Sequence, residues 1–300
     1  MLSCTQIRSK TTHQNTSPSK TQFRISEEPW RSQKDANFAN RIIIDFLYKE
    51  TGKAFKYIPS ISYAHTQALF KTGEIDIAVT GIFGAWKIKM ENPAAKIIAI
   101  EKPNFINVLV TNPNRNDDNL QKRRLMGLEA IKGWRVGFGS RYSGASFLYP
   151  ILEMKKAGIH PTDLYSCVHE PNQARLVTNV AEGTLDFAFI SSHLNAPLEN
   201  IPAHQQSLIK KVWQSNPKQN LVIIAGNRLI EEKNHGVLLK ITKSLRELTS
   251  LDPIDHTILH ALDSSELTRP THRLKNQVFE QISEASSGII KEAKNKCRQS

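Results

Sequence analysis

The stretch Gly73-Glu74-Ile75-Asp76-Ile77-Ala78 returns later in the chain as Gly183-Thr184-Leu185-Asp186-Phe187-Ala188. Each copy follows an amphipathic segment, SYAHTQALFKTG at 62–73 and NQARLVTNVAEG at 172–183, and leads into an apolar run that ends in small polar residues. A helix, a glycine and a buried strand form one supersecondary unit, so its recurrence predicts two similar lobes. Chance similarity between two such units is the alternative, because the shared pattern is only six residues long.

The residues around the first copy alternate between helix and strand patterns. Apolar residues in 37–52 fall at helical spacing, and Gly52 stands where a left-handed helix end belongs. Residues 53–58 read as a short strand, and Ser62 can cap the helix that follows. This alternation predicts an α/β fold with largely parallel sheets.

Length and composition bound the class of protein. A chain of 300 residues can bury one large core or two modest ones, and 39% hydrophobic residues is ordinary for a globular protein. Forty Lys and Arg against 28 Asp and Glu give a net charge of +12, which suits anionic ligands, membrane surfaces or nucleic acid without choosing among them. No run approaches the ~20 apolar residues of a membrane-spanning helix.

The three cysteines, Cys4, Cys167 and Cys297, lie far apart and form no CxxC pair. This spacing argues against a zinc knot or a disulfide framework, and Cys167, within the apolar run LYSCV, is predicted to be a small buried residue. Residues 1–22 are polar, lack the apolar core of a secretory signal, and are predicted to form a disordered tail. Leu2-Ser3-Cys4 is either the remnant of a lipoprotein cleavage box, with Cys4 lipidated, or an accidental cysteine.

Polar breaks between apolar strands predict where the chain crosses between lobes. These breaks lie near 111–113 and 215–220. The first lobe is therefore predicted to comprise 23–111 and 220–300, and the second lobe 112–219. The helix-rich last eighty residues are expected to pack on the first lobe.

The segment GFGSRYSGASFLYP, residues 137–150, has the composition of an anion-binding loop. It leaves an apolar strand and is expected to enter a helix near Ser143, whose free N–H groups and dipole attract anions. Ser143 and Ser146 add hydroxyl donors, and Arg141 adds a cation. The loop lacks the Lys-Ser/Thr pair of a Walker loop and the third glycine of a dinucleotide fingerprint. The alternative is a plain strand–helix turn with a capping serine.

Two further residues are candidates for the ligand site. His193 follows Ser191-Ser192 at the end of the second repeat strand, a position that tends to face the crevice in α/β folds. Tyr63 begins a helix in the first lobe. An exposed loop histidine and a half-buried aromatic are the alternatives. His169-Glu170 lacks the second histidine of a zinc protease, and there is neither a GxSxG elbow nor a close carboxylate pair, which argues against an enzyme.

Together these features resemble the phosphonate-binding solute receptors of ABC transporters, over most of the chain from Phe23 onward. Three segments carry the resemblance in the same order, TGKAFKYIPSISYAHTQALFKTGEIDIAVTG (51–81), IKGWRVGFGSRYSGASFLYPILEMKKAGI (131–159) and VWQSNPKQNLVI (212–223). The resemblance implies a periplasmic-type fold of two α/β lobes that close on a phosphonate or related oxyanion.

The resemblance also implies a set of ligand residues. Ser143 matches the first serine of the family's Ser-Thr-Ser run, whereas Gly144 and Ala145 replace the next two residues and Ser146 stands at the following glycine. Backbone donors survive these changes and two hydroxyls do not. The candidate ligand residues are Tyr63, Thr80, Gly81, Arg141, Tyr142, Ser143, Gly144, Ala145, Ser146, Gln173, Ser192 and His193.

Departures from the family pattern bear on the ligand. Tyr63 matches the family's first-lobe ligand tyrosine, Thr80 stands where the best-known members carry an aromatic residue, and Gln173 falls near a family histidine. His193 falls near a glutamate with which some members hold an aminoalkyl group. Losing that carboxylate argues against an aminoalkylphosphonate, and Arg141 with His193 favours a more anionic ligand or one without an amine.

These observations predict a monomeric, extracytoplasmic receptor, periplasmic or membrane-anchored, that hands a small anion to an ABC permease. No cofactor, metal or nucleic acid is expected. The alternatives are a ligand-sensing module of a signalling system, a bilobal protein for another small anion, an enzyme with this fold, and a ligand-responsive DNA-binding regulator. No helix-turn-helix pattern precedes the first lobe, and the ~20-residue tail is too short for one, which argues against the regulator.

Overall fold

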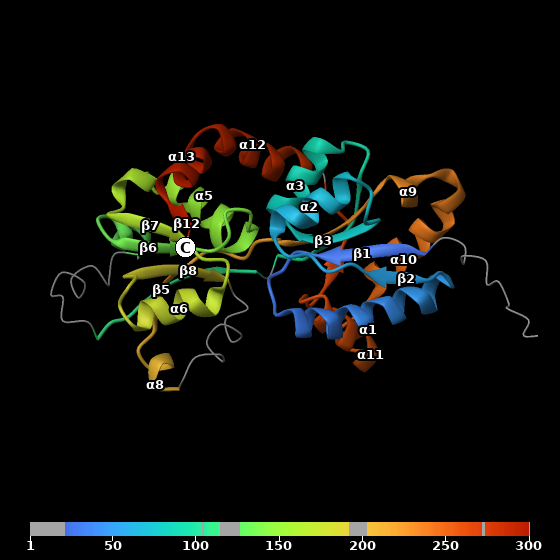
Figure 1. The fold of residues 1–300 in the computed structure, drawn as a ribbon, viewed down its shortest axis with the longest axis horizontal. Helices are drawn as coiled ribbons and strands as arrows, with labels where there is room; N and C mark the ends of the chain where they lie inside the picture. Colours follow the sequence, from blue (N-terminus) through green and yellow to red (C-terminus); the bar gives the residue numbers. More distant parts are fainter. Residues whose placement is uncertain (1–21, 104, 115–126, 192–202, 272–273, 300) are drawn as a thin grey trace, which may run out of the picture.

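A computed structural model describes residues 22–103, 105–114, 127–191, 203–271 and 274–299. These residues form two six-stranded sheets that lie side by side, each with helices on both faces (Figure 1). The strand order is β11-β4-β10-β3-β1-β2 in the first sheet and β12-β7-β6-β8-β5-β9 in the second. The predicted two-lobed α/β fold is confirmed. The prediction of largely parallel sheets was wrong, because β10 and β5 each pair antiparallel with both of their neighbours and make the sheets mixed.

The first sheet consists of β1 (Phe23–Glu27), β2 (Phe55–Tyr57), β3 (Ile77–Gly81), β4 (Lys96–Glu101), β10 (Leu221–Ala225) and β11 (Leu267–Thr268). Its helices are α1 (Gln33–Thr51), α2 (Tyr63–Lys71), α3 (Ile82–Glu91), α9 (Asn227–Ile230), η4 (Glu232–Asn234), α10 (His235–Glu247) and α11 (Pro253–Ala261).

The second sheet consists of β5 (Asn107–Thr111), β6 (Arg135–Phe138), β7 (Ser166–His169), β8 (Phe187–Ser191), β9 (Lys210–Gln214) and β12 (Arg298–Gln299). Its helices are η1 (Gly127–Ile131), the π-helical turn η2 (Gly144–Leu148), α5 (Tyr149–Lys156), η3 (Pro161–Asp163), α6 (Gln173–Ala181) and α8 (Ala203–Gln206). The C-terminal part adds η5 (Leu274–Val278), α12 (Phe279–Ser287) and α13 (Ile289–Lys296).

Local sequence signals set the ends of two helices of the first lobe, the start of α2 and the end of α1. The Ser62 hydroxyl accepts a hydrogen bond from the His65 amide and caps α2. Gly52 ends α1 with φ of 67°, a left-handed conformation that favours glycine. Both helix boundaries were predicted from the sequence.

The sequence repeat corresponds to one structural device in each lobe. In the first lobe, the Asp76 carboxylate accepts from the Arg24 amide at 2.7 Å, and the Arg24 guanidinium donates to the Gly73 carbonyl at 2.6 Å. The same contacts recur in the second lobe among Arg135, Asp186 and Gly183. In both lobes the aspartate ties the start of the repeat strand to its parallel neighbour, β1 or β6. The repeat in the sequence therefore corresponds to a repeated set of contacts in the structure.

The sheets divide the chain differently from the predicted boundaries. β5 pairs with β8 and β9 in the second sheet, so 107–111 belongs to the second lobe and the first crossover follows β4. The C-terminal part also returns to the second lobe, because β12 adds to β7 and apolar residues of α12 and α13 join the core of that lobe. A polar break in the sequence marks where a strand ends, but it does not indicate which of the two sheets that strand joins.

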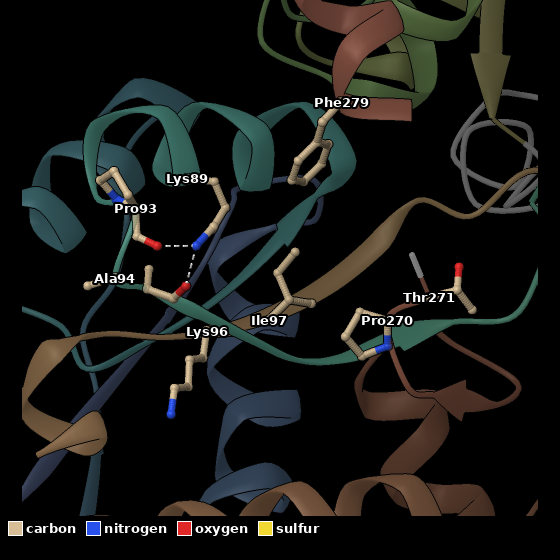
Figure 2. Close-up of a pocket in the computed structure, with 9 residues that line it drawn as sticks. Lys89, Pro93, Ala94, Lys96, Ile97, Pro270, Thr271 and Phe279 are labelled. Carbon is tan, nitrogen blue, oxygen red and sulfur yellow. Dashed lines mark hydrogen bonds between the residues drawn. The ribbon is translucent and has the colours of Figure 1, made fainter. Parts of the chain in front are cut away.

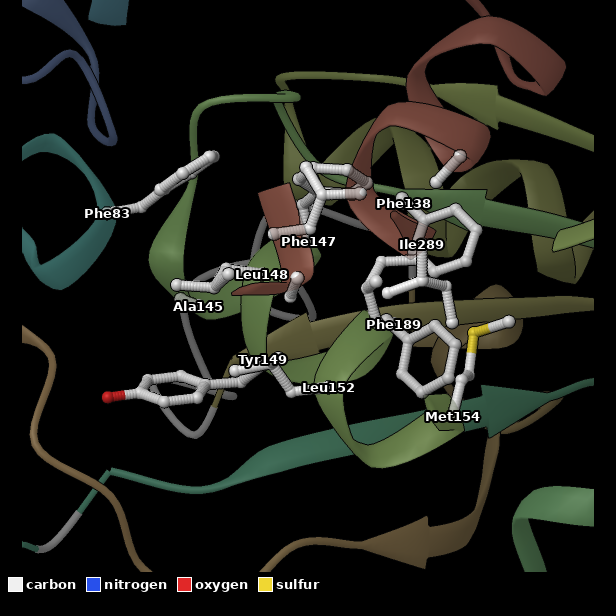
Figure 3. Close-up of a cluster of buried hydrophobic side chains, with 14 of the residues drawn as sticks. Phe83, Phe138, Ala145, Phe147, Leu148, Tyr149, Leu152, Met154, Phe189 and Ile289 are labelled. Carbon is white, nitrogen blue, oxygen red and sulfur yellow. The ribbon is translucent and has the colours of Figure 1, made fainter. Parts of the chain in front are cut away.

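The two lobes share a continuous apolar core. Phe138 and Phe189 stack with ring centroids 5.3 Å apart in the second lobe. Phe83 extends from α3 of the first lobe toward this cluster and is itself 1% exposed (Figure 3). Burying a phenylalanine side chain contributes about 2–3 kcal/mol, so this contact holds the lobes together. The structure is thus a closed arrangement of the lobes.

A disulfide bond joins Cys167 in β7 to Cys297 directly after α13. The two residues are 130 positions apart, and both are buried. The prediction that Cys167 is buried is confirmed, whereas the argument against a disulfide was wrong, because spacing along the chain does not reveal that β12 and β7 are neighbours. Cys4 and the predicted tail lie outside the described residues, save Gln22. Within the described ranges, no helix is long and apolar enough to span a membrane.

Removing this bond tests its contribution to stability. In a Cys4→Ser background, the double variant Cys167→Ala/Cys297→Ala is expected to unfold about 2–5 kcal/mol more easily, because a large loop is no longer closed in the unfolded chain. Urea denaturation followed by circular dichroism measures this difference. Cys4→Ser alone serves as the control and should match the unmodified chain. Equal stability of the double variant and its background would contradict the prediction.

Candidate functional site

The two lobes meet through backbone at Gly81 and Gly144. Gly81 ends β3 and precedes α3, and Gly144 begins η2. A Cβ placed on Gly81 would lie 3.7 Å from the Gly144 nitrogen, and one placed on Gly144 would lie 2.5 Å from Asn220 Oδ1 and 2.9 Å from Ile82 Cγ2. The approach of the lobes at this point therefore requires glycine at position 144.

Ser143 and the π-helical turn present backbone amides to this contact. The Ser143 hydroxyl accepts from the Ser146 amide at 3.2 Å and from the Ser146 hydroxyl at 3.1 Å. The amides of Leu148 and Tyr149 donate five residues back, to the carbonyls of Ser143 and Gly144. The first amides of a helix have no acceptor within it, and its dipole makes this end electropositive. The turn thus has the geometry of an anion site.

Pro150 has a role that its position in the sequence does not explain. A proline lacks the N–H that would bond to the carbonyl four residues earlier, which here is that of Ser146. That carbonyl instead accepts from the Gly139 amide at 2.9 Å. A Cβ on Gly139 would lie 1.8 Å from the Ser146 hydroxyl oxygen. The proline and the glycine together fold the loop back onto the start of its own helix.

Tyr63 lies at the start of α2 and reaches across the interface. Its side chain is buried, and burial raises the pKa of its phenol well above the ordinary value. The nearby Glu28 raises this pKa further, whereas a hydrogen bond with Ser143 lowers it. The phenol is therefore a neutral group that links the first lobe to the turn at Ser143. That Tyr63 binds a ligand, as the resemblance implies, remains a prediction.

Glu28 is a site residue that the sequence reasoning missed. It is fully buried, and one carboxyl oxygen accepts from the Gly81 amide at 2.7 Å. Burial raises the pKa of Glu28 to about 8, although the Gly81 amide and the Thr80 hydroxyl oppose this shift. An acidic pair followed by proline at the end of β1, Glu27-Glu28-Pro29, was the available signal. The first-lobe side of the site thus carries a carboxyl group that is protonated at neutral pH.

Asn220 is a second residue that was missed. It lies at the crossover before β10, and its side-chain oxygen is buried between Gly81 and Gly144 without a hydrogen-bond partner among the described residues. Its backbone amide donates to Glu101 at 2.5 Å. Burial raises the pKa of Glu101 to about 7, against the lowering by the amides of Leu221 and Asn220. Asn220 therefore places a polar group where both lobes and a crossover meet.

Of the other predicted ligand residues, Thr80, Ala145 and Gln173 have contacts that the structure describes. Thr80 is buried beside Gly81, and its hydroxyl donates to the Gly81 carbonyl. Ala145 lies in η2 with its carbonyl held by Asn107, and Gln173 accepts from the Ser191 amide at 3.0 Å and so holds the end of β8. Ser192 and His193 lie outside the described residues.

Arg141 and Tyr142 form the outer side of the same loop. They directly precede Ser143, and both are partly buried. The Tyr142 ring lies near two lysines, Lys87 of α3 and Lys294 of α13. These contacts join the loop to both lobes.

His169 fixes the base of the loop rather than binding metal. Its Nδ1 donates to the Gly139 carbonyl at 3.0 Å, and its ring packs edge-on against Phe147. Burial lowers the pKa of His169 to about 4, with the cations Arg141 and Lys294 adding to the shift. It is therefore neutral. In the part of the chain that the structure describes, no group of His, Cys, Asp and Glu could hold a metal ion.

A separate cavity of about 710 Å³ lies beside the first lobe and contains none of the predicted ligand residues. Figure 2 shows Lys89 turned toward carbonyl groups rather than into solvent, with its ammonium group donating to the carbonyls of Pro93 and Ala95. Pro270, Ile97 and Phe279 add apolar walls (Figure 2). Lys96 is the second lysine of the lining, and the cavity is separate from the candidate site at Gly81 and Gly144.

Comparisons with known proteins identify the family to which the chain is similar. Residues 25–272 match the family described as "ABC transporter, phosphonate, periplasmic substrate-binding protein". A probable ABC transporter phosphite binding protein, PhnD1 of Prochlorococcus marinus, is 29% identical over 116 residues, which span 38% of each chain.

Solved structures show the same fold. The structure of PhnD1 from Prochlorococcus marinus in complex with methylphosphonate superposes with a TM-score of 0.74 at 18% identity, covering 89% of this chain and 98% of the other. A binding protein component of an ABC phosphonate transporter from Pseudomonas aeruginosa gives a TM-score of 0.66 at 15% identity, covering 91% and 95%. The matched family consists of substrate-binding receptors rather than enzymes, as the sequence predicted. The chain thus belongs to the family of periplasmic phosphonate-binding proteins of ABC transporters.

Proposed function

We propose that the chain captures a small oxyanion of the phosphonate, phosphite or phosphate class between its lobes and delivers it to an ABC permease. The observation that carries this proposal is the start of η2, where Ser143 and Gly144 face Gly81 and Tyr63 of the other lobe. An anion held there would contact donors of both lobes only when the lobes are closed. Binding would therefore favour the closed arrangement.

The altered serine run supports the same function. Gly144 and Ala145 remove two hydroxyl donors relative to the family pattern, but their amides remain at the electropositive end of the helix. Because Gly144 has no side chain, Ile82 and Asn220 of the opposite side lie where a Cβ at position 144 would be. The loss of two hydroxyls is thus offset by a closer approach of the lobes.

The charge of the site supports a ligand without an amine. Glu28 is the buried carboxyl group nearest Gly81, and burial keeps it protonated up to a pH of about 8. A neutral carboxyl group can donate a hydrogen bond to an oxyanion and attracts an ammonium group only weakly. Phosphite and methylphosphonate, which the names of the two PhnD1 matches mention, are therefore the first ligands to test.

The proposed setting is extracytoplasmic, where the receptor would act as a monomer without nucleic acid or cofactor. The Cys167–Cys297 disulfide supports it, because such bonds persist in oxidising compartments. A sensing module would use the same site, and vesicles carrying the permease distinguish the two: only a transport receptor stimulates ligand uptake.

A single methyl group at Gly144 tests capture by closure. Gly144→Ala is expected to weaken binding of methylphosphonate roughly 10- to 100-fold, because the added carbon would collide with Asn220 and Ile82 in the closed form. Ser143→Ala should weaken it about tenfold by removing a hydroxyl at the site. Isothermal titration calorimetry measures both.

Gly236→Ala is the matched control, because a Cβ at that position meets nothing within 4 Å. Its affinity should equal that of the unmodified chain. If neither phosphite, phosphate nor any alkylphosphonate binds the unmodified protein, capture of this class of anion is ruled out.

Glu28 gives the protein a specific pH dependence. The folded protein keeps this carboxyl group protonated to a pH of about 8, whereas the unfolded chain ionises it near 4.5, so unfolding releases a proton between these values. The free energy of unfolding therefore falls as pH rises from 4.5 to 8, by a few kcal/mol for this group. In Glu28→Gln this contribution is absent.

Urea unfolding at pH 5, 6, 7 and 8 provides the comparison. The stability of the unmodified protein relative to Glu28→Gln should decrease steadily across the series. The difference between the two proteins, rather than either alone, is the measurement, because Glu101 contributes in the same direction and His169 in the opposite one. A constant difference would show that Glu28 is ionised in the folded protein.

A further inference from the structure

Three cationic side chains gather beside the anion-binding turn, and we call them the cation cluster: Lys87 of α3, Arg141 of the loop before η2, and Lys294 of α13. The Lys87 ammonium lies 5.3 Å from the centre of the Tyr142 ring, and the Lys294 ammonium lies 5.1 Å from the same ring. Both ammonium groups therefore lie close to one and the same aromatic ring.

The cation cluster has no carboxylate partner among the described residues. Glu292, on the same helix as Lys294, pairs instead with His160 at 3.5 Å. The Arg141 Nε atom is buried and makes no hydrogen bond within the described ranges. Burial, together with the charges of Lys87 and Arg141, lowers the pKa of Lys294 to about 8. The cluster thus concentrates positive charge that no carboxylate of the described residues neutralises.

Aromatic contacts account for only part of this arrangement. Lys294 also lies 5.0 Å from the centre of the Phe83 ring, so two rings attract its charge. A ring quadrupole does not remove the repulsion among three cations that are all partly buried. The arrangement is therefore better suited to receiving a negative charge than to holding Tyr142 in place.

The cation cluster is next to the proposed anion site and spans both lobes. Arg141 and Tyr142 immediately precede Ser143, and consecutive Cα atoms are only about 3.8 Å apart. Lys87 comes from the first lobe, one and a half turns after the start of α3 at Ile82, whereas Lys294 belongs to a helix that packs with the second lobe. Closure of the lobes thus brings the three charges together, and a negative group between them would favour closure.

We propose that the cation cluster is a second anion subsite, which receives a carboxylate on the organic part of a phosphonate whose phosphonate group lies at Ser143 and Gly144. The ligand class would be the phosphonocarboxylates. This inference rests on the proposed function, because it places the phosphonate group at the site described above. It explains why Arg141 stands beside a serine run that has lost two hydroxyl groups.

Calorimetry with three ligands tests the subsite. The probes are phosphonoacetate, 2-oxopropylphosphonate, which has nearly the same shape without the carboxylate charge, and methylphosphonate. Phosphonoacetate is expected to bind at least about tenfold more tightly than the ketone, because charge-assisted hydrogen bonds to the cluster are made only by the carboxylate. The longer 3-phosphonopropionate tests the spacing between the two subsites.

Substitutions assign the preference to particular lysines. Lys87→Gln and Lys294→Gln should each reduce the preference for phosphonoacetate several-fold and leave the affinity for methylphosphonate within about twofold. Lys291→Gln is the matched control, since it removes the same charge from an exposed position on α13 and should change nothing. Circular dichroism confirms that each variant is folded.

The outcomes separate this inference from the proposed function. If methylphosphonate binds but neither phosphonocarboxylate, phosphonoacetate or 3-phosphonopropionate, binds better than the ketone, the subsite is wrong and the receptor function stands. A preference that survives both lysine substitutions also overturns the subsite. If no phosphonate binds at all, the proposed function fails, and the subsite fails with it.

Discussion

The site depends on one constraint, the close approach of two helix starts from different lobes. Gly81 precedes α3 and Gly144 begins η2, and no side chain fits between Gly144 and the opposite lobe. Both helices direct their electropositive ends toward the interface, where repulsion between two such ends must be offset. In the first lobe the Glu28 carboxyl group accepts from the Gly81 amide, but because it is protonated it adds no negative charge. An oxyanion bound beside this contact would supply that charge.

The repeated aspartate–arginine contact explains how two lobes with little sequence in common present matching edges. In each lobe it fixes where the repeat strand begins relative to its parallel neighbour. β3 and β8 are then both five residues long and end in small residues, Gly81 and Ser191. A change in the register of either strand would move its end away from the interface. The aspartate–arginine contacts thus help to set the geometry of the candidate site, although they lie away from it.

Local features of the fold could be predicted from the sequence, whereas features that depend on distant parts of the chain could not. Ser62 and Ser143 indicate helix starts in the sequence, because a helix cap involves only residues that are close together along the chain. The membership of β5, the return of α13 and the Cys167–Cys297 bond depend on which strands become neighbours, and composition does not encode this directly. Glu28 was overlooked for a related reason: burial, not sequence context, makes its carboxyl group unusual. Resemblance supplied Tyr63, which periodicity alone would have left as an ordinary aromatic residue.

The junction between β12 and β7 has a consequence for how the molecule is made. The second lobe begins at β5, yet its edge strand and one half of its disulfide come from the last residues of the described chain, after β10 and β11 have been added to the first lobe. Both lobes therefore stay unfinished until nearly the whole polypeptide has been delivered. The order of the strands therefore delays the completion of both lobes. The Cys167–Cys297 bond can close the second lobe only after the last described helix, α13, has been made.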